Sequence, residues 1–425
     1  MFIGIKMINN KKQIIALSII VIVIAVVLRF YIYNKSIIGY PKGLDGEYQF
    51  YQLKKHIAEK RFPIEGVFLN SPDTYDSEDN ARVPGGYFYI SYIIKYFIGG
   101  GTYEGARLVN LITSILISII FFIWIYKRFN ITTFFITLAL MSVNVYFLQA
   151  GNNIYNPHNP LILSFIFIPV LYEYLYNDKK FIYAVLLFPI LALSAQCHFS
   201  NFFSIIPSLI IFLIIRWNKE TKKNIFPLSI GVFISFLTYL PYLIYQFQNN
   251  FESLAKILSR KSELDAHYII QPPQIYSIFL FTTNEAGHKY VNGIKDIINS
   301  YFGNNPLYIF TFIFYILSIL IALFILIYTY KHFFTKKMIT NDDKKTNTLK
   351  DLLFFYILYI IISVVFYMLA SIGAGRPHYF YSSFTLGFIP FIYFIENITY
   401  VKPKYINYFC LYAILNIIAI VIYNY

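Results

Sequence analysis

The segment Leu44 to Tyr48 (LDGEY) holds two carboxylates that could carry chemistry, Asp45 and Glu47. A carboxylate there could take a proton from an acceptor hydroxyl or amine, or bind a divalent cation such as Mg²⁺ or Mn²⁺. Acids two positions apart share one side of an extended segment, whereas on a helix they diverge by about 200°. Gly46 permits a sharp turn that would point one carboxylate inward. The alternative is a pair of solvated loop acids.

Two arginines are candidates for binding a phosphate or diphosphate, Arg82 and Arg376. The guanidinium group offers a planar set of donors that matches phosphate oxygens. Arg82 is equally suited to an ion pair within its loop. Arg376 is the only basic residue in the short loops expected on the outer side, and its alternative role is an anchor at lipid headgroups.

Three histidines complete the set of candidate substrate-binding residues: His158, His198 and His378. A single histidine in such a place is typically a hydrogen-bonded packing residue, but a shared position on one side favours contact with substrate. The sequence has no HExxH motif or other strong zinc spacing. Cys197 and Cys410 lie in apolar stretches, and their spacing predicts neither a disulfide framework nor a metal site.

The elements that position these residues are membrane helices. The chain is 58% hydrophobic and only 13% charged, and several apolar runs exceed the roughly 18 residues that mark a membrane-spanning helix. The sequence therefore predicts an all-α polytopic membrane protein. The net charge of +14 is typical of basic cytoplasmic loops in a membrane protein, and we expect no nucleic-acid partner.

The distribution of lysine and arginine predicts the orientation. Lys6, Lys11 and Lys12 precede the first apolar run, and most other short loops on that side are basic. We expect a single domain over residues 1–425, with about eleven transmembrane helices and a cytoplasmic N-terminus. Two long outer loops are predicted, a first outer catalytic loop at 34–107 and a second at 248–305. All seven candidate site residues then lie toward the outer face.

Within the first loop, residues Gly46 to Lys60 have Phe50, Leu53 and Ile57 at helical spacing. This pattern predicts a short interfacial helix lying on the membrane, which would hold the two acids at headgroup level. A disordered surface helix is the alternative. The apolar block from Phe181 to Trp217 is too long for one span, and its polar centre at 196–201 divides it into two. We interpret the second outer loop as a partly helical cover over the site.

Four segments, in this order, resemble motifs of the GT-C class of polytopic glycosyltransferases, which includes protein O-mannosyltransferases and lipid A aminoarabinose transferases. They are the acidic segment Leu44 to Tyr48, the Pro-containing segment Asn80 to Tyr89, the start of the second span at Gly105 to Asn110, and Gln196 to Ser200 followed by Pro207. The acidic segment departs from the commoner adjacent Asp-Glu pair because Gly46 intervenes. The segment after Arg82 lacks the His-Pro-Pro form of many members.

The resemblance implies transfer of a sugar, with inversion, from a polyprenyl-phosphate carrier to a lipid, glycan or protein acceptor at the outer leaflet. It implies Asp45 as general base, with Glu47 supporting it or helping to hold a cation. It also implies an integral protein of a prokaryotic plasma membrane, surrounded by membrane lipids and working in cell-envelope glycan biosynthesis.

Two other functions remain open from the sequence. A lipid-linked glycan flippase or other transporter would perform no chemistry. A polysaccharide polymerase or ligase relies on paired arginines in a late outer loop, where this chain offers only Arg260 without a clear second arginine. The chain lacks a Trp-Trp-Asp motif, which argues against transfer of a whole oligosaccharide to asparagine.

Overall fold

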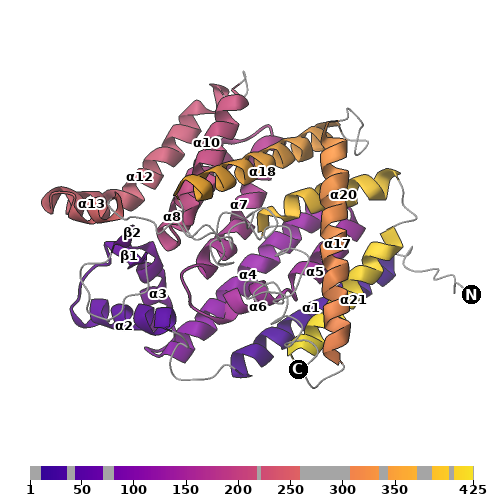
Figure 1. Cartoon of the computed structure of the whole chain (residues 1–425), viewed down its shortest axis with the longest axis horizontal. Helices are drawn as coiled ribbons and strands as arrows, with labels where there is room; N and C mark the ends of the chain where they lie inside the picture. Colours follow the sequence, from indigo (N-terminus) through magenta and orange to yellow (C-terminus); the bar gives the residue numbers. More distant parts are fainter. Residues whose placement is uncertain are drawn as a thin grey trace, which may run out of the picture.

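A computed structural model describes residues 11–35, 44–69, 81–217, 222–258, 307–334, 343–370, 385–401 and 406–424. These residues form a helical bundle, and α2, β1, β2 and α3 gather beside it (Figure 1). The bundle elements are α1 (Lys11–Lys35), α4 (Tyr103–Arg128), α5 (Ile131–Met141), α6 (Val145–Asn152), α7 (His158–Tyr176), α8 (Phe181–Cys197), α9 (Ser200–Phe203), α10 (Ile205–Ile215), α12 (Ile225–Gln248), α13 (Glu252–Leu258), α17 (Leu307–Phe333), α18 (Asp343–Ala370), α20 (Phe388–Val401) and α21 (Ile406–Asn424).

Among the described residues, six helices include a stretch long and apolar enough to cross a membrane: α1, α4, α7, α12, α17 and α18. Five shorter apolar helical stretches accompany them: Ile131–Met141, Phe181–Cys197, Ser200–Ile215, Phe388–Thr399 and Ile406–Ile418. In the bilayer core a helix satisfies its own backbone polar groups, which is why such apolar runs fold this way. The chain is an integral membrane protein, and the number of crossings stays a prediction.

The apolar block after Phe181 divides as predicted. Helix α8 ends at Cys197 and α9 begins at Ser200. Helix α8 packs against α7 on one side and α12 on the other, while α10 packs against α18. The polar residues between α8 and α9 therefore lie at one end of a buried helix.

Two elements differ from what the sequence predicts. The apolar run at about 131–150 predicts a single helix, but the structure has two, because α5 ends at Met141 and α6 begins at Val145. The backbone carbonyl of Ser142 at this break accepts a hydrogen bond from Arg29 Nη1 at 2.7 Å, which satisfies a carbonyl that a helix end leaves unpaired. The basic stretch Lys331 to Lys350 predicts a loop, but its second part, from Asp343, is the start of α18.

The first long loop contains two helices and a hairpin. Helix α2 (Leu44–Ala58) confirms a helix at the predicted place, and α3 (Tyr87–Ile98) packs against α4. Between them β1 (Glu65–Phe68) pairs antiparallel with β2 (Arg82–Pro84), a hairpin that the sequence did not predict. Side chains from these elements form a hydrophobic cluster of their own, which includes Phe50, Leu53 and Phe88.

Buried carboxylates join the helices at the end of α4 that is remote from α3. Glu173 of α7 accepts hydrogen bonds from Arg128 Nε at 2.7 Å and Nη2 at 2.6 Å, and from Trp124 Nε1 at 2.8 Å. Glu396 of α20 accepts from Thr133 Oγ1 at 2.6 Å and from Lys345 Nζ at 2.7 Å. Each carboxylate is thus paired with a cation, as burial of a charge requires.

Candidate functional site

Asp45 and Glu47 lie in the first turn of helix α2. This corrects the expectation of a sharp turn at Gly46, because the residue is helical and half-buried. The two side chains therefore diverge by about 200° around the helix axis, as residues two apart on a helix do. They cannot act as a pair that converges on one point.

The neighbours one turn further along α2 show which way each acid faces. Residues four apart share a face of a helix. Asp45 shares its face with Gln49, which is 3% exposed, whereas Glu47 shares its face with Tyr51, which is 40% exposed. Asp45 is therefore on the side of α2 that packs against the protein, and Glu47, which is half-buried as Asp45 is, lies on the side of Tyr51.

Helix α2 is fixed to the turn between α6 and α7 by a pair of hydrogen bonds. Gln49 Nε2 donates to Asn156 Oδ1 at 2.9 Å, and the Asn156 backbone N–H donates to Gln49 Oε1 at 3.3 Å. Asn156 Nδ2 also donates to the carbonyl of Cys197 at the end of α8, at 3.0 Å. The turn at 153–157 thereby connects α2 with α8.

The same turn is held from the other side by the first turns of α4. Arg107 is almost fully buried, and its Nε donates to the carbonyl of Asn152 at 2.9 Å. Asn110 Nδ2 donates to the carbonyl of Gly151 at 2.9 Å, and Asn110 Oδ1 accepts from Lys95 Nζ of α3 at 2.8 Å. These contacts satisfy carbonyls at the end of α6 and leave the turn little freedom.

Asp45 contacts this turn directly. The Tyr155 hydroxyl donates to Asp45 Oδ2 at 3.3 Å, longer than the roughly 2.7–2.8 Å typical of O–H···O bonds. The rings of Tyr155 and His158 meet edge to face with centroids 5.3 Å apart. His158 Nδ1 lies 3.3 Å from the carbonyl of Asn153, so Nδ1 is the donor in that contact. Asp45, Tyr155 and His158 therefore form one cluster.

Gln196 at the end of α8 positions the hairpin and α3. Its Oε1 accepts from the backbone N–H of Tyr87 at 3.1 Å, and its Nε2 donates to Thr238 Oγ1 of α12 at 2.8 Å. Gly85 has φ +88°, and a Cβ added there would lie 2.5 Å from Gln196 Cδ. Glycine is required at this position for its backbone conformation and for this close approach. His198 directly follows the last residue of α8. It is buried, and its Nδ1 lies 2.6 Å from Ser200 Oγ.

Arg82 lies on β2 and is joined to α2 through stacked rings. Its guanidinium is 4.2 Å from the centroid of Phe68, which stacks on Tyr48 at 4.7 Å. Arg82 Nε is 4.0 Å from Glu65 Oε2, the length of a weak ion pair. Burial and the charge of Arg82 lower the pKa of His56 on α2, because both disfavour its protonated form.

The structure thus places five of the seven predicted residues on elements linked through the 153–157 turn, α2 and the end of α8: Asp45, Glu47, Arg82, His158 and His198. Glu47 is on α2 but on a different side of the helix from Asp45. Arg376 and His378 lie outside the described residues, and so does most of the second outer loop, 248–305, of which α13 is described.

The described residues do not fit a divalent-cation site at the acid pair. Asp45 and Glu47 diverge around α2, whereas Mg²⁺ and Mn²⁺ need several oxygen ligands that converge. Across the described ranges no group of three His, Cys, Asp or Glu side chains is placed to hold a metal ion.

The residues that the sequence analysis missed are mostly amides. Gln49, Asn156 and Lys95 lie in no motif, and their partners are distant in sequence. Gln196 lies in the segment Gln196 to Ser200, but the sequence assigns it no role. The one available signal was the polar run from Asn152 to Asn159 between two apolar helices, which is typical of a functional turn.

No protein-family model and no curated protein sequence matches this chain. Solved structures of an oligosaccharyltransferase from Archaeoglobus fulgidus are similar to it. The archaeal enzyme AglB in complex with an inhibitory peptide and a dolichol-phosphate matches with a TM-score of 0.50 and 12% identity, covering 97% of this chain and 56% of that one. The same organism's enzyme tethered to an acceptor peptide with an NVT sequon matches with a TM-score of 0.49 and 12% identity, over 98% and 55%.

The chain spans little more than half the length of these structures. At this identity the first match shows a shared fold and nothing finer. The chain shares its fold with the archaeal oligosaccharyltransferase of the first match.

Proposed function

We propose that this protein is a glycosyltransferase that moves a sugar from a polyprenyl-phosphate carrier to a lipid, glycan or protein acceptor at the outer face of the membrane. The observation that carries the proposal is the position of Asp45. A half-buried carboxylate at the start of α2 faces the 153–157 turn, which is fixed by hydrogen bonds from α2, α4 and α8. A rigid support of this kind is what a general base needs, since catalysis depends on a fixed geometry.

In the proposed step Asp45 takes the proton of the acceptor hydroxyl or amine. The acceptor atom then forms a bond to the anomeric carbon as the bond between that carbon and the phosphate oxygen breaks. The electron pair leaves with the polyprenyl phosphate, and attack from the opposite side inverts the anomeric centre. His158 and His198 are proposed to contact the sugar or acceptor, and Arg82 and Arg376 to bind the phosphate.

The fold supports this class of chemistry by analogy. The similar archaeal structure is an oligosaccharyltransferase that holds a dolichol-phosphate and a peptide. By analogy we propose a lipid-phosphate donor here. The transfer of a single sugar, and not of a whole oligosaccharide, is proposed from the sequence motifs. The expected inside position of the N-terminus places Asp45 toward the outer leaflet.

The direct test is a transfer assay with the full-length protein in vesicles. A tritiated polyprenyl-phosphate sugar pool is extracted from membranes of the producing cells and offered with the corresponding acceptor fraction. We expect equal amounts of free polyprenyl phosphate and labelled acceptor to form, each acceptor gaining one sugar. Movement of intact donor across the bilayer without release of lipid phosphate would support a flippase and contradict the proposal. Chains that lengthen on the lipid would support a polymerase instead.

A further inference from the structure

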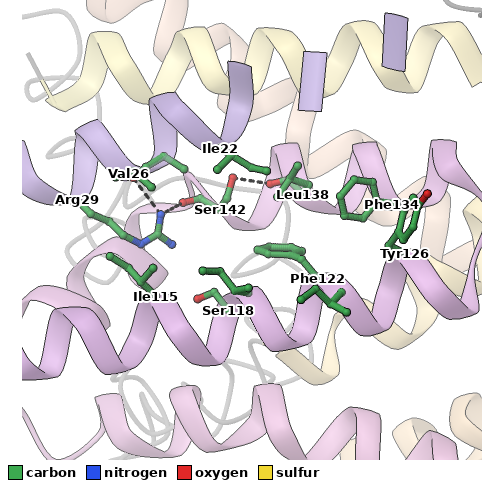
Figure 2. Close-up of a pocket in the computed structure, with 13 residues that line it drawn as sticks. Ile22, Val26, Arg29, Ile115, Ser118, Phe122, Tyr126, Phe134, Leu138 and Ser142 are labelled. Carbon is green, nitrogen blue, oxygen red and sulfur yellow. Dashed lines mark hydrogen bonds between the residues drawn. The ribbon is translucent and has the colours of Figure 1, made fainter. Parts of the chain in front are cut away.

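A cavity of about 240 Å³ lies between α1, α4 and α5, on elements that do not carry Asp45. Figure 2 shows it, with Arg29 at one end and mostly apolar side chains along the rest. Its volume exceeds the roughly 150 Å³ of an engineered apolar cavity that takes up benzene. Space for part of a hydrocarbon chain is therefore present.

One flank of this cavity is open toward the surroundings of the bundle. Ile22 of α1 and Ile119 and Ile123 of α4 line it and are exposed. Helices α1 and α4 are both long and apolar enough to span the membrane, so their exposed isoleucines face hydrocarbon and not water. The cavity is therefore a groove that a lipid chain can enter sideways from the bilayer.

Arg29 gives the groove a charged end. Its side chain is buried, with the residue 3% exposed. Nη1 donates to the carbonyls of Ala25 at 3.1 Å and Ser142 at 2.7 Å, and the guanidinium lies 4.8 Å from the Phe147 centroid. Nε is buried without an acceptor, and the described part of the chain gives Arg29 no ion pair with a carboxylate.

The hydrogen bonds of Arg29 Nη1 join α1 to the end of α5. The other two nitrogens of the guanidinium take no part in this connection. A buried cation without a counter-ion is strongly unfavourable in a bilayer, and intramembrane arginines are typically functional for that reason. The donors that have no acceptor and the positive charge favour binding of an anion. An apolar groove with a cation at its end fits a molecule with a hydrocarbon chain and a phosphate head.

The depth of Arg29 agrees with such a molecule. Helix α1 has 25 residues and is about 37 Å long, whereas the hydrocarbon core of a bilayer is about 30 Å thick. Arg29 lies six residues before the end of α1, or about 9 Å. It is thus near the edge of the core, where a guanidinium can meet lipid phosphates. The groove continues from there toward Ile22 and Tyr126, deeper into the bilayer.

We propose that this groove binds one acyl chain of an anionic glycerophospholipid of the surrounding bilayer, with its phosphate held by Arg29. The second acyl chain stays in the bilayer, which the open flank allows. The bound lipid fills the space between α1, α4 and α5 and neutralises Arg29. The site is separate from the candidate catalytic residues and does not depend on the proposed function.

Native mass spectrometry of the full-length protein, titrated with phosphatidylglycerol or with phosphatidylcholine of the same acyl chains, tests this proposal. We expect the wild-type protein to retain one phosphatidylglycerol at least about tenfold more tightly than phosphatidylcholine, the effect expected of charge-assisted hydrogen bonds. Arg29→Met should abolish that preference, and Arg29→Lys should keep part of it.

A matched pair on α1 keeps the test decisive if Arg29→Met does not fold. Ile22→Trp fills the groove and should reduce retention of phosphatidylglycerol about tenfold. Ile20→Trp adds the same bulk at an exposed position of α1 that does not line the groove, and should leave retention unchanged. Equal retention of the two lipids by the wild type, equal effects of the two tryptophans, or displacement of phosphatidylglycerol by equimolar polyprenyl phosphate would each overturn the proposal.

Discussion

Gln49 and Asn156 are 107 positions apart in the sequence and exchange two hydrogen bonds, at 2.9 Å and 3.3 Å. Both side chains are buried. Gln49 lies one helical turn after Asp45. Asn156 directly follows Tyr155, whose hydroxyl contacts Asp45. This pair therefore fixes Asp45, the proposed base, with respect to the 153–157 turn.

Replacing Gln49 should impair positioning of Asp45 without removing a group that touches substrate. Gln49→Leu leaves the buried amide of Asn156 short of a partner, which costs roughly 1–3 kcal/mol. We expect kcat to fall about tenfold or more with KM for donor changed much less, since each 1.4 kcal/mol is about tenfold in rate. Tyr51→Leu, on the exposed face of α2, is the matched control and should retain kcat. Equal kcat in Gln49→Leu and the wild type would show that the pair does not position Asp45.

Gly85→Ala should destabilise the fold more than Gly100→Ala. Both glycines have positive φ, +88° and +75°, but an added Cβ meets Gln196 only at Gly85 and has open space at Gly100. Both substitutions carry a backbone penalty of about 1 kcal/mol, and the overlap with Gln196 adds about 1–3 kcal/mol. Thermal unfolding in detergent measures the difference. If Gln196→Ala costs as much stability in the Gly85→Ala background as in the wild type, the contact is not the cause.

The stability of the protein should depend on pH through Lys95. Burial lowers the pKa of Lys95 to about 8, below its value of about 10.4 in an unfolded chain. Between these values the unfolded state binds a proton that the folded state does not, so stability rises with pH in that window. From pH 8 to 9.5 we expect wild type to gain about 1.5 kcal/mol relative to Lys95→Met.

The difference between Lys95→Met and the wild type is the quantity to measure, by chemical unfolding at each pH. Burial also raises the pKa of Tyr87 to about 12, which opposes stability only above pH 10 and is common to both proteins. Parallel curves for the two proteins from pH 8 to 9.5 would mean that Lys95 stays protonated in the fold.

The membrane class, a helix after Leu44 and the division of the block after Phe181 could be predicted because each rests on local hydrophobic pattern. The break between Met141 and Val145 could not, because an apolar run hides it and Arg29 from α1 satisfies its carbonyl. The hairpin of β1 and β2 is too short to show strand periodicity. Hydrogen bonds between distant residues, such as Gln49 with Asn156, leave no trace in one sequence.

The orientation of Asp45 and Glu47 could not be predicted from the sequence either. The chemistry and spacing of Asp45 and Glu47 mark both as candidates, but the different roles proposed for them rest on neighbours one turn away, Gln49 and Tyr51, whose burial only the fold determines. The sequence favours a turn at Gly46, because glycine in a helix is about 1 kcal/mol less favourable than alanine. In the structure, packing of α2 overcomes this cost.

The central claim is that Asp45, and not Glu47, takes the proton from the acceptor. It is tested most directly by single-turnover transfer with Asp45→Asn and Glu47→Gln, each replacing a carboxylate by its amide and each checked for insertion and thermal stability. We predict a rate lower by about 10²–10⁴ in Asp45→Asn, the usual contribution of a general base, and a rate within a few-fold of wild type in Glu47→Gln. Full transfer by Asp45→Asn, or loss of transfer in Glu47→Gln alone, would contradict the account.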